Sequence, residues 1–440
     1  MKKERVIKGV ALLITLVFVV ILGIGAVAIA RLHSTEISLV RRQNNSTRAF
    51  YLAEAGIEMA IAQIKADSYN INISPIGTTY LGDGSYSVNF NQIGDIITIT
   101  STGTITNINI FRIVEQKVEL GSVLAKYVVL VKMNGWTSGD NAIYGRPDPD
   151  HPEYPEGVSL DPEDRMKMYI MGDHYEARSN VHIYGDLFVE GDFYSEDSTY
   201  VHGDTYLGVK DDGSQGVFDG DGTITDGYSL AGGDLDDDND LHPMRPDQYE
   251  VYPEIDTSYY STHSDVPLSG NEYIEFVEDG DHTRVDVYED ASYSEVVDSY
   301  ALPAAQGVVY TNGDIHVKGT VKGRVTVVAS DDIFFEGDII YANGTHYANQ
   351  SDSTAFLAYD DMYFQPDSVE VSGMLYVQEG SMSENADNPQ RLRIYGNRIM
   401  ASQSSFSGYS DREYIYDPNI RKYPTPKLPV VPVRKEWQEK

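Results

Sequence analysis

Hydrophobic residues are unevenly distributed along the chain, and the longest uninterrupted apolar segment lies near the amino terminus. Residues 9–30, GVALLITLVFVVILGIGAVAIA, form 22 consecutive positions without a charge. A helix needs roughly 20 such residues to cross the core of a bilayer, whereas the apolar part of a cleaved secretory signal usually has about 7–15. The pattern therefore predicts a retained membrane-spanning helix after a short basic leader at 1–9.

The apolar spacing changes after the membrane segment. Phe50, Ala53, Ile57, Ile61 and Ile64 recur every three or four residues, which is typical of an amphipathic helix. We expect helix over residues 10–66, unless the Asn-Asn-Ser segment at 44–46 interrupts it or caps a second helix. Small residues on this helix would let other helices, as well as its own globular part, approach closely; they are Ala49, Ala53, Ala55, Ala60 and Ala62.

Between residues 80 and 120 the period shortens to two. The segments GSYSVNF, DIITITST and FRIVEQKVEL are rich in β-branched and aromatic residues and are separated by Gly, Asn and Asp, which is typical of an antiparallel meander. We assign this β meander to residues 67–135, with LAKYVVLVKM at 124–133 as a further strand. Residues 136–164 include a proline-punctuated segment at 144–157 and are expected to form linker and loops.

The remaining chain repeats short β-prone runs with an apolar–Gly–Asp–apolar order, as in VHIYGDLFVEGDFY and FFEGDIIY. Such runs without a strict period predict a mainly-β head at 165–425, built as an irregular β-solenoid; a β-sandwich is the alternative, because antiparallel strands show similar alternation. The most acidic text, at about 210–300, is expected to be an insertion. Residues 426–440 are proline-spaced and are expected to form an extended tail.

The amino-terminal residues resemble a known family. The basic leader ending in Gly9, the apolar helix and the segment AFYLAEAGIE are similar to the amino-terminal region of PilX-type minor pilins, which are accessory subunits of type IV pilus machinery. The resemblance covers about residues 1–66. It implies cleavage by a prepilin peptidase between Gly9 and Val10. It also implies that other pilins or pseudopilins and the pilus assembly machinery are partners, and that the meander packs on the helix as in pilin heads. Residues 308–341 also resemble a domain of unknown function associated with such amino termini.

One position departs from the pattern of major pilins, which usually carry glutamate at the fifth mature position. Here that position is Ile14. An apolar residue avoids the cost of an unpaired carboxylate in hydrocarbon but cannot pair with the amino terminus of another subunit. PilX-type proteins often lack this glutamate, as does the tip subunit of the similar type II secretion pseudopilus. The resemblance therefore implies a subunit that initiates or caps a filament.

Charge adds a constraint on partners and location. The formal net charge is -35, yet the first 66 residues carry +5, which leaves -40 for residues 67–440. Such an acidic body would repel nucleic acid. The basic leader favours a cytoplasmic amino terminus, so we expect a single-pass protein of the cytoplasmic (inner) membrane with an extracytoplasmic head at the pilus or cell surface. The chain has no cysteine, which excludes disulfides and thiolate metal sites.

The segment FDGDGTITDG at 218–227 is the sharpest candidate metal site. Asp219, Asp221 and Asp226 are spaced as in the middle of an EF-hand loop, whose carboxylate and backbone oxygens bind Ca²⁺. However, Val217 and Tyr228 occupy the positions of the first ligand and the bidentate glutamate. A solvated Gly-Asp turn is the alternative to a Ca²⁺ site here. The acidic run at 234–240 is a looser candidate of the same kind.

Two Asp-Asp pairs, at 331–332 and 360–361, raise the question of catalysis. Some β-helical enzymes cut polysaccharides with paired carboxylates, but adjacent strand residues face opposite ways, and both pairs fall at expected turns. We therefore expect a protein that is not an enzyme and has no certain cofactor. The alternative to a minor pilin is a signal-anchored surface adhesin, or a polysaccharide-binding or -processing β-solenoid, unrelated to a filament.

Overall fold

The computed structural model describes most of the chain. The described residues are 2–66, 74–93, 96–106, 108, 110–121, 123–138, 141–144, 167–178, 181–195, 199–201, 204–220, 223–224, 241–244, 252, 254–303, 306–343, 351–402, 406, 408–417, 420, 425–428 and 431–439. They form two compact units, one comprising residues 1–120 and 431–440 and the other residues 121–430. We call them unit 1 and unit 2.

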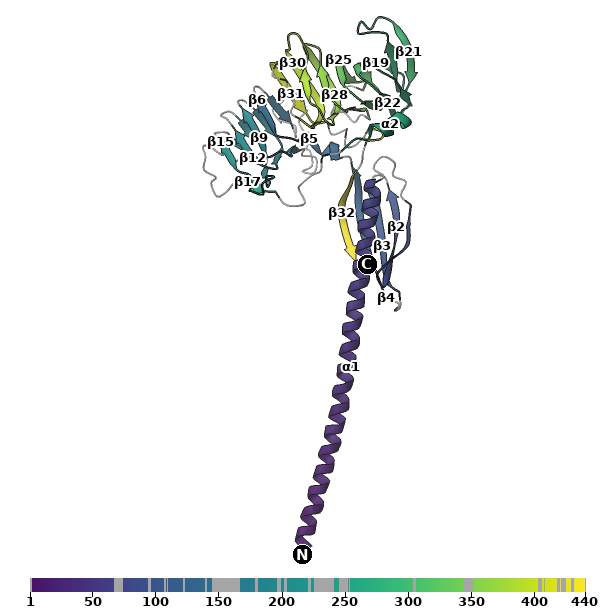
Figure 1. Cartoon of the computed structure of the whole chain (residues 1–440), viewed down its shortest axis with the longest axis vertical. Coiled ribbons are helices and arrows are strands. Elements are labelled where there is room, and N and C mark those ends of the chain that lie inside the picture. The colour runs from purple at the N-terminus through teal and green to yellow at the C-terminus, as the bar shows by residue number, and fades with distance from the viewer. Residues whose placement is uncertain are drawn as a thin grey trace. The chain divides into compact units, whose positions relative to one another are not determined.

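Unit 1 contains a single continuous helix, α1 (Lys2–Ala66). It passes through the Asn-Asn-Ser segment at 44–46 without a break and ends where the apolar periodicity ends (Figure 1). At 1.5 Å per residue its 65 residues span about 98 Å. By length and composition α1 is apolar enough to cross a membrane, and none of its most apolar described window is buried.

The carboxyl-terminal third of α1 packs against an antiparallel sheet. Its strands are ordered β1-β2-β3-β4-β32, and their bounds are β1 (Ile76–Leu81), β2 (Gly84–Ile93), β3 (Ile96–Ile105), β4 (Ile110–Gly121) and β32 (Val431–Glu439). Ile57 and Ile61 of α1 are buried with Ile99 of β3 and Val114 of β4. The first four strands are the meander that the period-two pattern indicates, and β32 is the expected extended tail, which here completes the sheet.

The small residues of α1 serve chiefly the contact with this sheet. Ala49, Ala53 and Ala60 are fully buried in unit 1, whereas Ala55 is half-buried and Ala62 is exposed. Strand β3 approaches so closely at Gly103 that a Cβ atom there would overlap the backbone of α1. The side chains on the alanine-rich face are small because the backbone of the sheet lies directly against the helix.

Unit 2 consists mainly of short strands. Their bounds are β5 (Tyr127–Val131), β6 (Gly135–Ser138), β7 (Asn141–Tyr144), β8 (Lys167–Ile170), β9 (His174–Arg178), β10 (Val181–Tyr184), β11 (Asp186–Val189), β12 (Asp192–Ser195), β13 (Thr199–Val201), β14 (Thr205–Leu207), β15 (Phe218–Gly220), β16 (Thr223–Ile224), β17 (Leu241–Pro243), β18 (Val266–Pro267), β19 (Glu272–Asp279), β20 (His282–Tyr288), β21 (Val296–Ala301), β22 (Gln306–Thr311), β23 (Ile315–Val321), β24 (Arg324–Ala329), β25 (Ile333–Tyr341), β26 (Ser353–Ala358), β27 (Met362–Phe364), β28 (Ser368–Val377), β29 (Met382–Glu384), β30 (Arg391–Met400) and β31 (Asp411–Ile415). A 3-10 helix (Val123–Lys126) precedes β5, and helix α2 (Thr257–His263) precedes β18.

Most neighbouring strands of unit 2 are parallel, and most pairs keep a constant register along their length. One ladder runs β18-β22-β24-β26-β28-β30-β5-β8-β11-β14-β17. The chain enters this ladder at β5, in the middle, and builds toward β17. It then resumes at β18, at the opposite end, and returns until β30 pairs with β5. A single hydrophobic core runs through both halves.

Three segments of unit 2 differ from the sequence-based expectations. Residues 136–164 are expected to form linker and loops, but β6 pairs in parallel with β9, and β7 pairs in parallel with β10 and β31. The strand at 127–131 does not join the meander, because it pairs in parallel with β30 and β8. Within the expected acidic insertion, β19 pairs in parallel with β23 and in antiparallel with β20. Both β19 and β20 bury alternate apolar residues, such as Phe276 and Val285, so this part of the segment belongs to the packed head.

Candidate functional site

A row of carboxylates lies where successive parallel strands of unit 2 begin. Asp314, Asp332 and Asp361 immediately precede β23, β25 and β27. Oδ1 of Asp314 accepts a hydrogen bond of 3.3 Å from the backbone N–H of Asp332. Oδ1 of Asp332 in turn accepts from the N–H of Asp361 at 2.8 Å, and Asp361 from the N–H of Ser381 at 2.6 Å. We call Asp314, Asp332 and Asp361 the Asp row.

The row explains why Gly and Asp recur together before the strands. Elsewhere in unit 2, Asp186 and Asp192 likewise accept backbone N–H groups of neighbouring segments. Glycines stand where these segments approach each other most closely. A Cβ at Gly191 would overlap the carbonyl oxygen of Asp173, and one at Gly380 that of Asp360. Part of the acidic character of the head therefore serves hydrogen bonds to backbone N–H groups of neighbouring segments.

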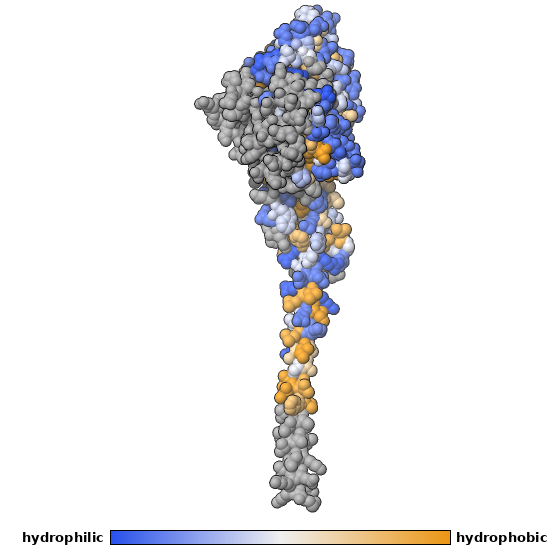
Figure 2. Space-filling view, turned by 90° about the vertical axis from the view of Figure 1, so that its left-hand side faces the viewer, coloured by the Kyte–Doolittle hydropathy of each residue, from blue (hydrophilic) through white to orange (hydrophobic). Residues whose placement is uncertain are grey.

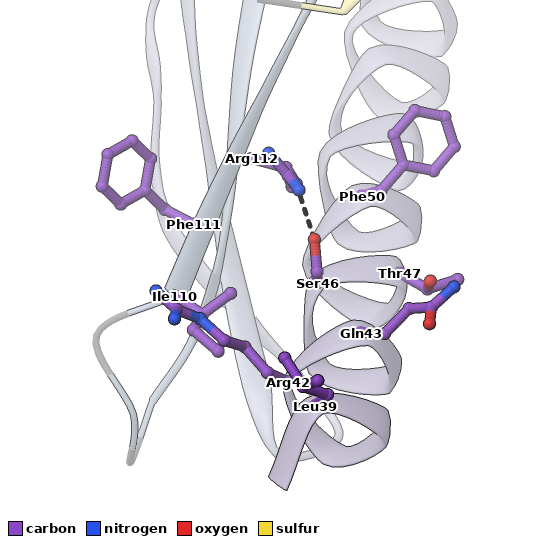
Figure 3. Close-up of a pocket in the computed structure, with 9 residues that line it drawn as sticks. All are labelled: Leu39, Arg42, Gln43, Ser46, Thr47, Phe50, Ile110, Phe111 and Arg112. Carbon is purple, nitrogen blue, oxygen red and sulfur yellow. Dashed lines mark hydrogen bonds between the residues drawn. The ribbon is translucent and has the colours of Figure 1, made fainter. Parts of the chain in front are cut away.

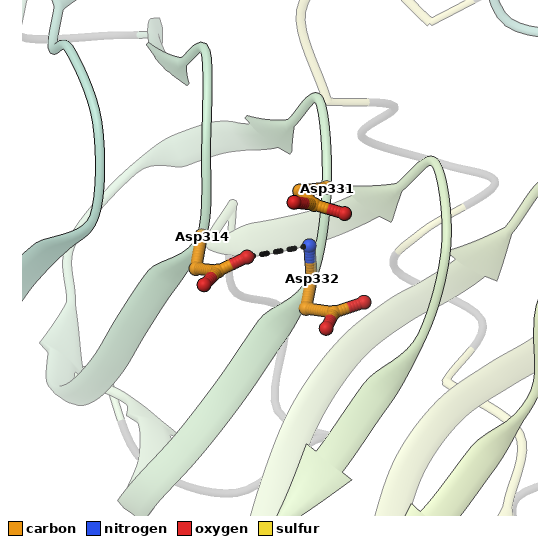
Figure 4. Close-up of side chains that lie close together, drawn as sticks. All are labelled: Asp314, Asp331 and Asp332. Carbon is orange, nitrogen blue, oxygen red and sulfur yellow. Dashed lines mark hydrogen bonds between the residues drawn. The ribbon is translucent and has the colours of Figure 1, made fainter.

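The Asp row also gathers negative charge. Carboxyl oxygens of Asp314, Asp331 and Asp332 lie within 4.8 Å of one another, close enough to hold a metal ion (Figure 4). Burial, together with the charge of the neighbouring carboxylates, raises the pKa of Asp332 to about 6. Burial also raises the pKa of Asp331, whose side chain forms a hydrogen bond with that of Asp360.

The structure groups these carboxylates differently from the sequence pattern. The two Asp-Asp pairs do fall at bends before strands, but the grouping that forms crosses strands and includes Asp314, which the pattern of adjacent pairs misses. Its signal is positional: Asp314 follows Gly313 and immediately precedes a strand, at the same offset as Asp332 and Asp361.

Of the three residues predicted to bind Ca²⁺, only Asp219 lies among the described residues. It is exposed in β15 and is in register with Tyr194 of β12. Asp221, Asp226 and the acidic run at 234–240 lie outside the described residues.

The second candidate site is the exposed apolar surface of α1. Gly9 and Val10 both lie within this helix, near its start. Figure 2 shows patches of hydrophobic residues along its described part. Large apolar side chains there are at least 47% exposed; they are Leu16, Phe18, Val19, Val20, Ile21, Leu22, Ile24, Val27, Ile29, Leu32, Ile37, Leu39 and Val40. In water such a surface would be strongly unfavourable, and large exposed apolar patches mark contact with lipid or with another protein.

No family model and no curated protein matches the sequence. Among solved structures, the chain is similar to the crystal structure of the competence-associated pilin ComZ from Thermus thermophilus, with 10% sequence identity and a TM-score of 0.35 over 90% of this chain and 97% of that chain.

Proposed function

We propose that this chain is a membrane-anchored minor pilin of the PilX type, which docks through α1 into a type IV pilus or pseudopilus. The observation that carries the proposal is the division of α1 into two parts. From Ala49 to Ile64 its apolar face is buried against the sheet of unit 1, whereas the described apolar side chains from Leu16 to Val40 are exposed.

The exposed part of α1 can be covered in two successive ways. The bilayer core accommodates about 20 apolar residues as a helix, and the uncharged segment at 9–30 fills it. After extraction, helices of other subunits would have to replace the lipid, since the apolar surface remains costly in water. The sheet of unit 1 packs only against the carboxyl-terminal part of α1. The rest of the helix is therefore available first to lipid and then to other helices.

Processing and position in the filament follow from the resemblance of residues 1–66. The proposal includes cleavage by a prepilin peptidase between Gly9 and Val10, storage as a single-pass protein of the inner membrane, and an extracytoplasmic head. With Ile14 in place of a carboxylate, the subunit would initiate or cap the assembly.

We assign the head as an irregular β-solenoid without a catalytic role. Two observations support this part of the proposal. The long parallel ladder is the pairing that stacked coils produce, whereas a sandwich of antiparallel strands would alternate in direction. The carboxylates of the Asp row accept backbone N–H groups, which gives them a structural task.

Mass spectrometry of the mature protein from membranes of its own host tests the proposal. We expect a chain that begins at Val10, methylated on its amino group. A chain that retains Met1 and the leader would contradict it and favour a permanently anchored surface adhesin. A Gly9→Val variant, in which the residue before the cleavage site is enlarged, provides the matched control and should remain uncut.

A further inference from the structure

A basic groove lies in unit 1 between α1 and the start of β4 (Figure 3). It has a volume of about 880 Å³ and includes Leu39, Arg42 and Phe50 of the helix and Ile110, Phe111 and Arg112 of the strand. The Nε of Arg112 donates a hydrogen bond of 2.8 Å to Oγ of Ser46 across the groove. Leu39 remains 59% exposed, so no described residue of unit 1 covers this apolar end of the groove. The side chain of Phe111 points away from α1 (Figure 3).

The charge of this groove is opposite to that of the protein. No Asp or Glu is among its described lining residues, although the chain as a whole carries -35. Arg41 and Arg42 form no ion pair with any described residue. A second groove, of about 540 Å³ and also lined by helix residues of this segment, contains Arg41 and Arg48. Arg48 forms an ion pair with Asp83, so Arg41 is the arginine there without a described counterion. The helix segment 39–51 therefore presents Arg41 and Arg42 in two neighbouring grooves.

The position of the groove along α1 distinguishes a protein occupant from a lipid. Arg42 follows Ala30, the last residue of the uncharged segment, by twelve residues, or about 18 Å along a helix. The headgroup region of each leaflet is only about 7 Å thick, so an upright helix holds Arg42 beyond the lipid. The groove spans Leu39 to Phe50 on the helix side, about 17 Å, and it leads toward the membrane into the exposed apolar surface at Leu32 and Ile37. A partner that lies in it would continue alongside the membrane helix.

We infer that this groove receives the helix of a different membrane-anchored pilin-like subunit, one that carries a carboxylate just after its own membrane segment. The inference rests on the function proposed above and adds the chemistry of the partner. Apolar side chains of the incoming helix would pack on Leu39 and Ile110, in the manner of a helix in a groove. Its carboxylate would meet Arg42 and Arg112, so charge selects the partner.

Site-specific photo-crosslinking in cells that express the full chain tests the inference. Benzoylphenylalanine replaces Leu39 in the groove and, in a separate variant, Leu22 in the exposed membrane segment. From position 39 we expect a covalent product with another pilin-like subunit, joined through a peptide of its helix that contains Asp or Glu. Arg42→Glu should lower that yield about tenfold or more, because like charges then face each other, and Arg42→Lys should restore it. Thr78→Glu, an exposed position of β1 outside the groove, is the control and should leave the yield unchanged.

The outcomes separate the two proposals. A product at position 39 that contains only lipid or a second copy of this chain would overturn the inference, as would a yield that is unaffected by Arg42→Glu. If position 22 still yields pilin-like partners in those cases, the proposed function stands and only the groove assignment fails. Absence of protein products at both positions would contradict both.

Discussion

Asp332 accepts a hydrogen bond of 2.8 Å from the backbone N–H of Asp361 while lying among other carboxylates. The side chain thus links the starts of β25 and β27 at an electrostatic cost. Because burial raises its pKa to about 6, the folded head binds the proton more tightly than the unfolded chain does. Its contribution to the free energy of unfolding is therefore complete below about pH 4 and is lost as the pH rises through 6.

The variant Asp332→Asn tests this pH dependence. The amide oxygen can still accept the N–H of Asp361, but the charge is gone. When the pH is raised from 4.5 to 7.5, we expect the free energy of unfolding of the variant to increase relative to that of the wild type. The expected increase is about 1 kcal/mol after allowance for solvent screening. Urea unfolding of both proteins at the two pH values measures this difference. Asp290→Asn serves as control: hydrogen bonds from Ser292 lower the pKa of Asp290, so this carboxyl is ionised in the folded and the unfolded chain at both pH values, and its replacement should leave the difference between them nearly unchanged. A difference at Asp332 that is independent of pH would contradict the assignment.

Glycine at the close approaches between strands should be irreplaceable. A Cβ at Gly191 would overlap the carbonyl of Asp173, and this backbone cannot move without disturbing the pairing of β9 with β12. We expect Gly191→Ala to destabilise the head by about 2 kcal/mol, in the range of other overpacking changes. Gly77→Ala, where nothing lies within 4 Å of the added methyl group, should have little effect. Equal melting temperatures for the two variants would refute the close-packing explanation.

The contact between α1 and β3 leaves no room for a larger side chain. Ala53 is fully buried and Gly103 lies against the helix backbone beside it. Ala53→Leu should therefore lower the free energy of unfolding of unit 1 by about 1–3 kcal/mol. Ala62→Leu, on the exposed face of the same helix, should be nearly neutral. Thermal unfolding monitored by circular dichroism compares them, and a neutral Ala53→Leu would show that the sheet does not hold the helix this closely.

The carboxyl-terminal strand should stabilise unit 1 despite its distance in sequence. Trp437 packs edge-on against Phe50 with ring centroids 5.9 Å apart, and Gln438 donates a hydrogen bond of 2.6 Å to Glu115. A chain that ends at residue 430 should expose the edge of β4 and be cleaved faster by proteases within unit 1. Trp437→Ala should retain β32 and lose only about 1 kcal/mol, typical of an aromatic pair. Identical cleavage of the truncated and full-length chains would contradict a role for β32.

Local patterns sufficed for α1 and for the meander β1–β4, because each residue there contacts neighbours that are close in sequence. They did not suffice for β32, whose Gln438 meets a partner 323 residues away, or for β5, which pairs with β30 near the end of unit 2. The sequence pattern does not predict the Asp row for the same reason. Adjacent Asp-Asp pairs are visible in the sequence, but Asp314 joins Asp332 only because parallel pairing brings β23 beside β25.

The basic groove was likewise invisible in the sequence, since Arg42 and Arg112 are 70 residues apart and no motif connects them. The helix alone showed an excess of positive charge. Its meaning depends on β4, which places Ile110 and Arg112 beside the same turns of α1.

The central claim is that the exposed apolar surface of α1 serves lateral assembly with other helices and not permanent residence in lipid. Photo-crosslinking from Leu22, which is 68% exposed, tests it most directly, in filaments or pseudopili sheared from cells and freed of membrane. We expect Leu22 to be joined to the membrane segment of another pilin-like subunit in that fraction. If the chain is absent from the sheared fraction and Leu22 is joined only to phospholipid in the membrane, the claim is wrong.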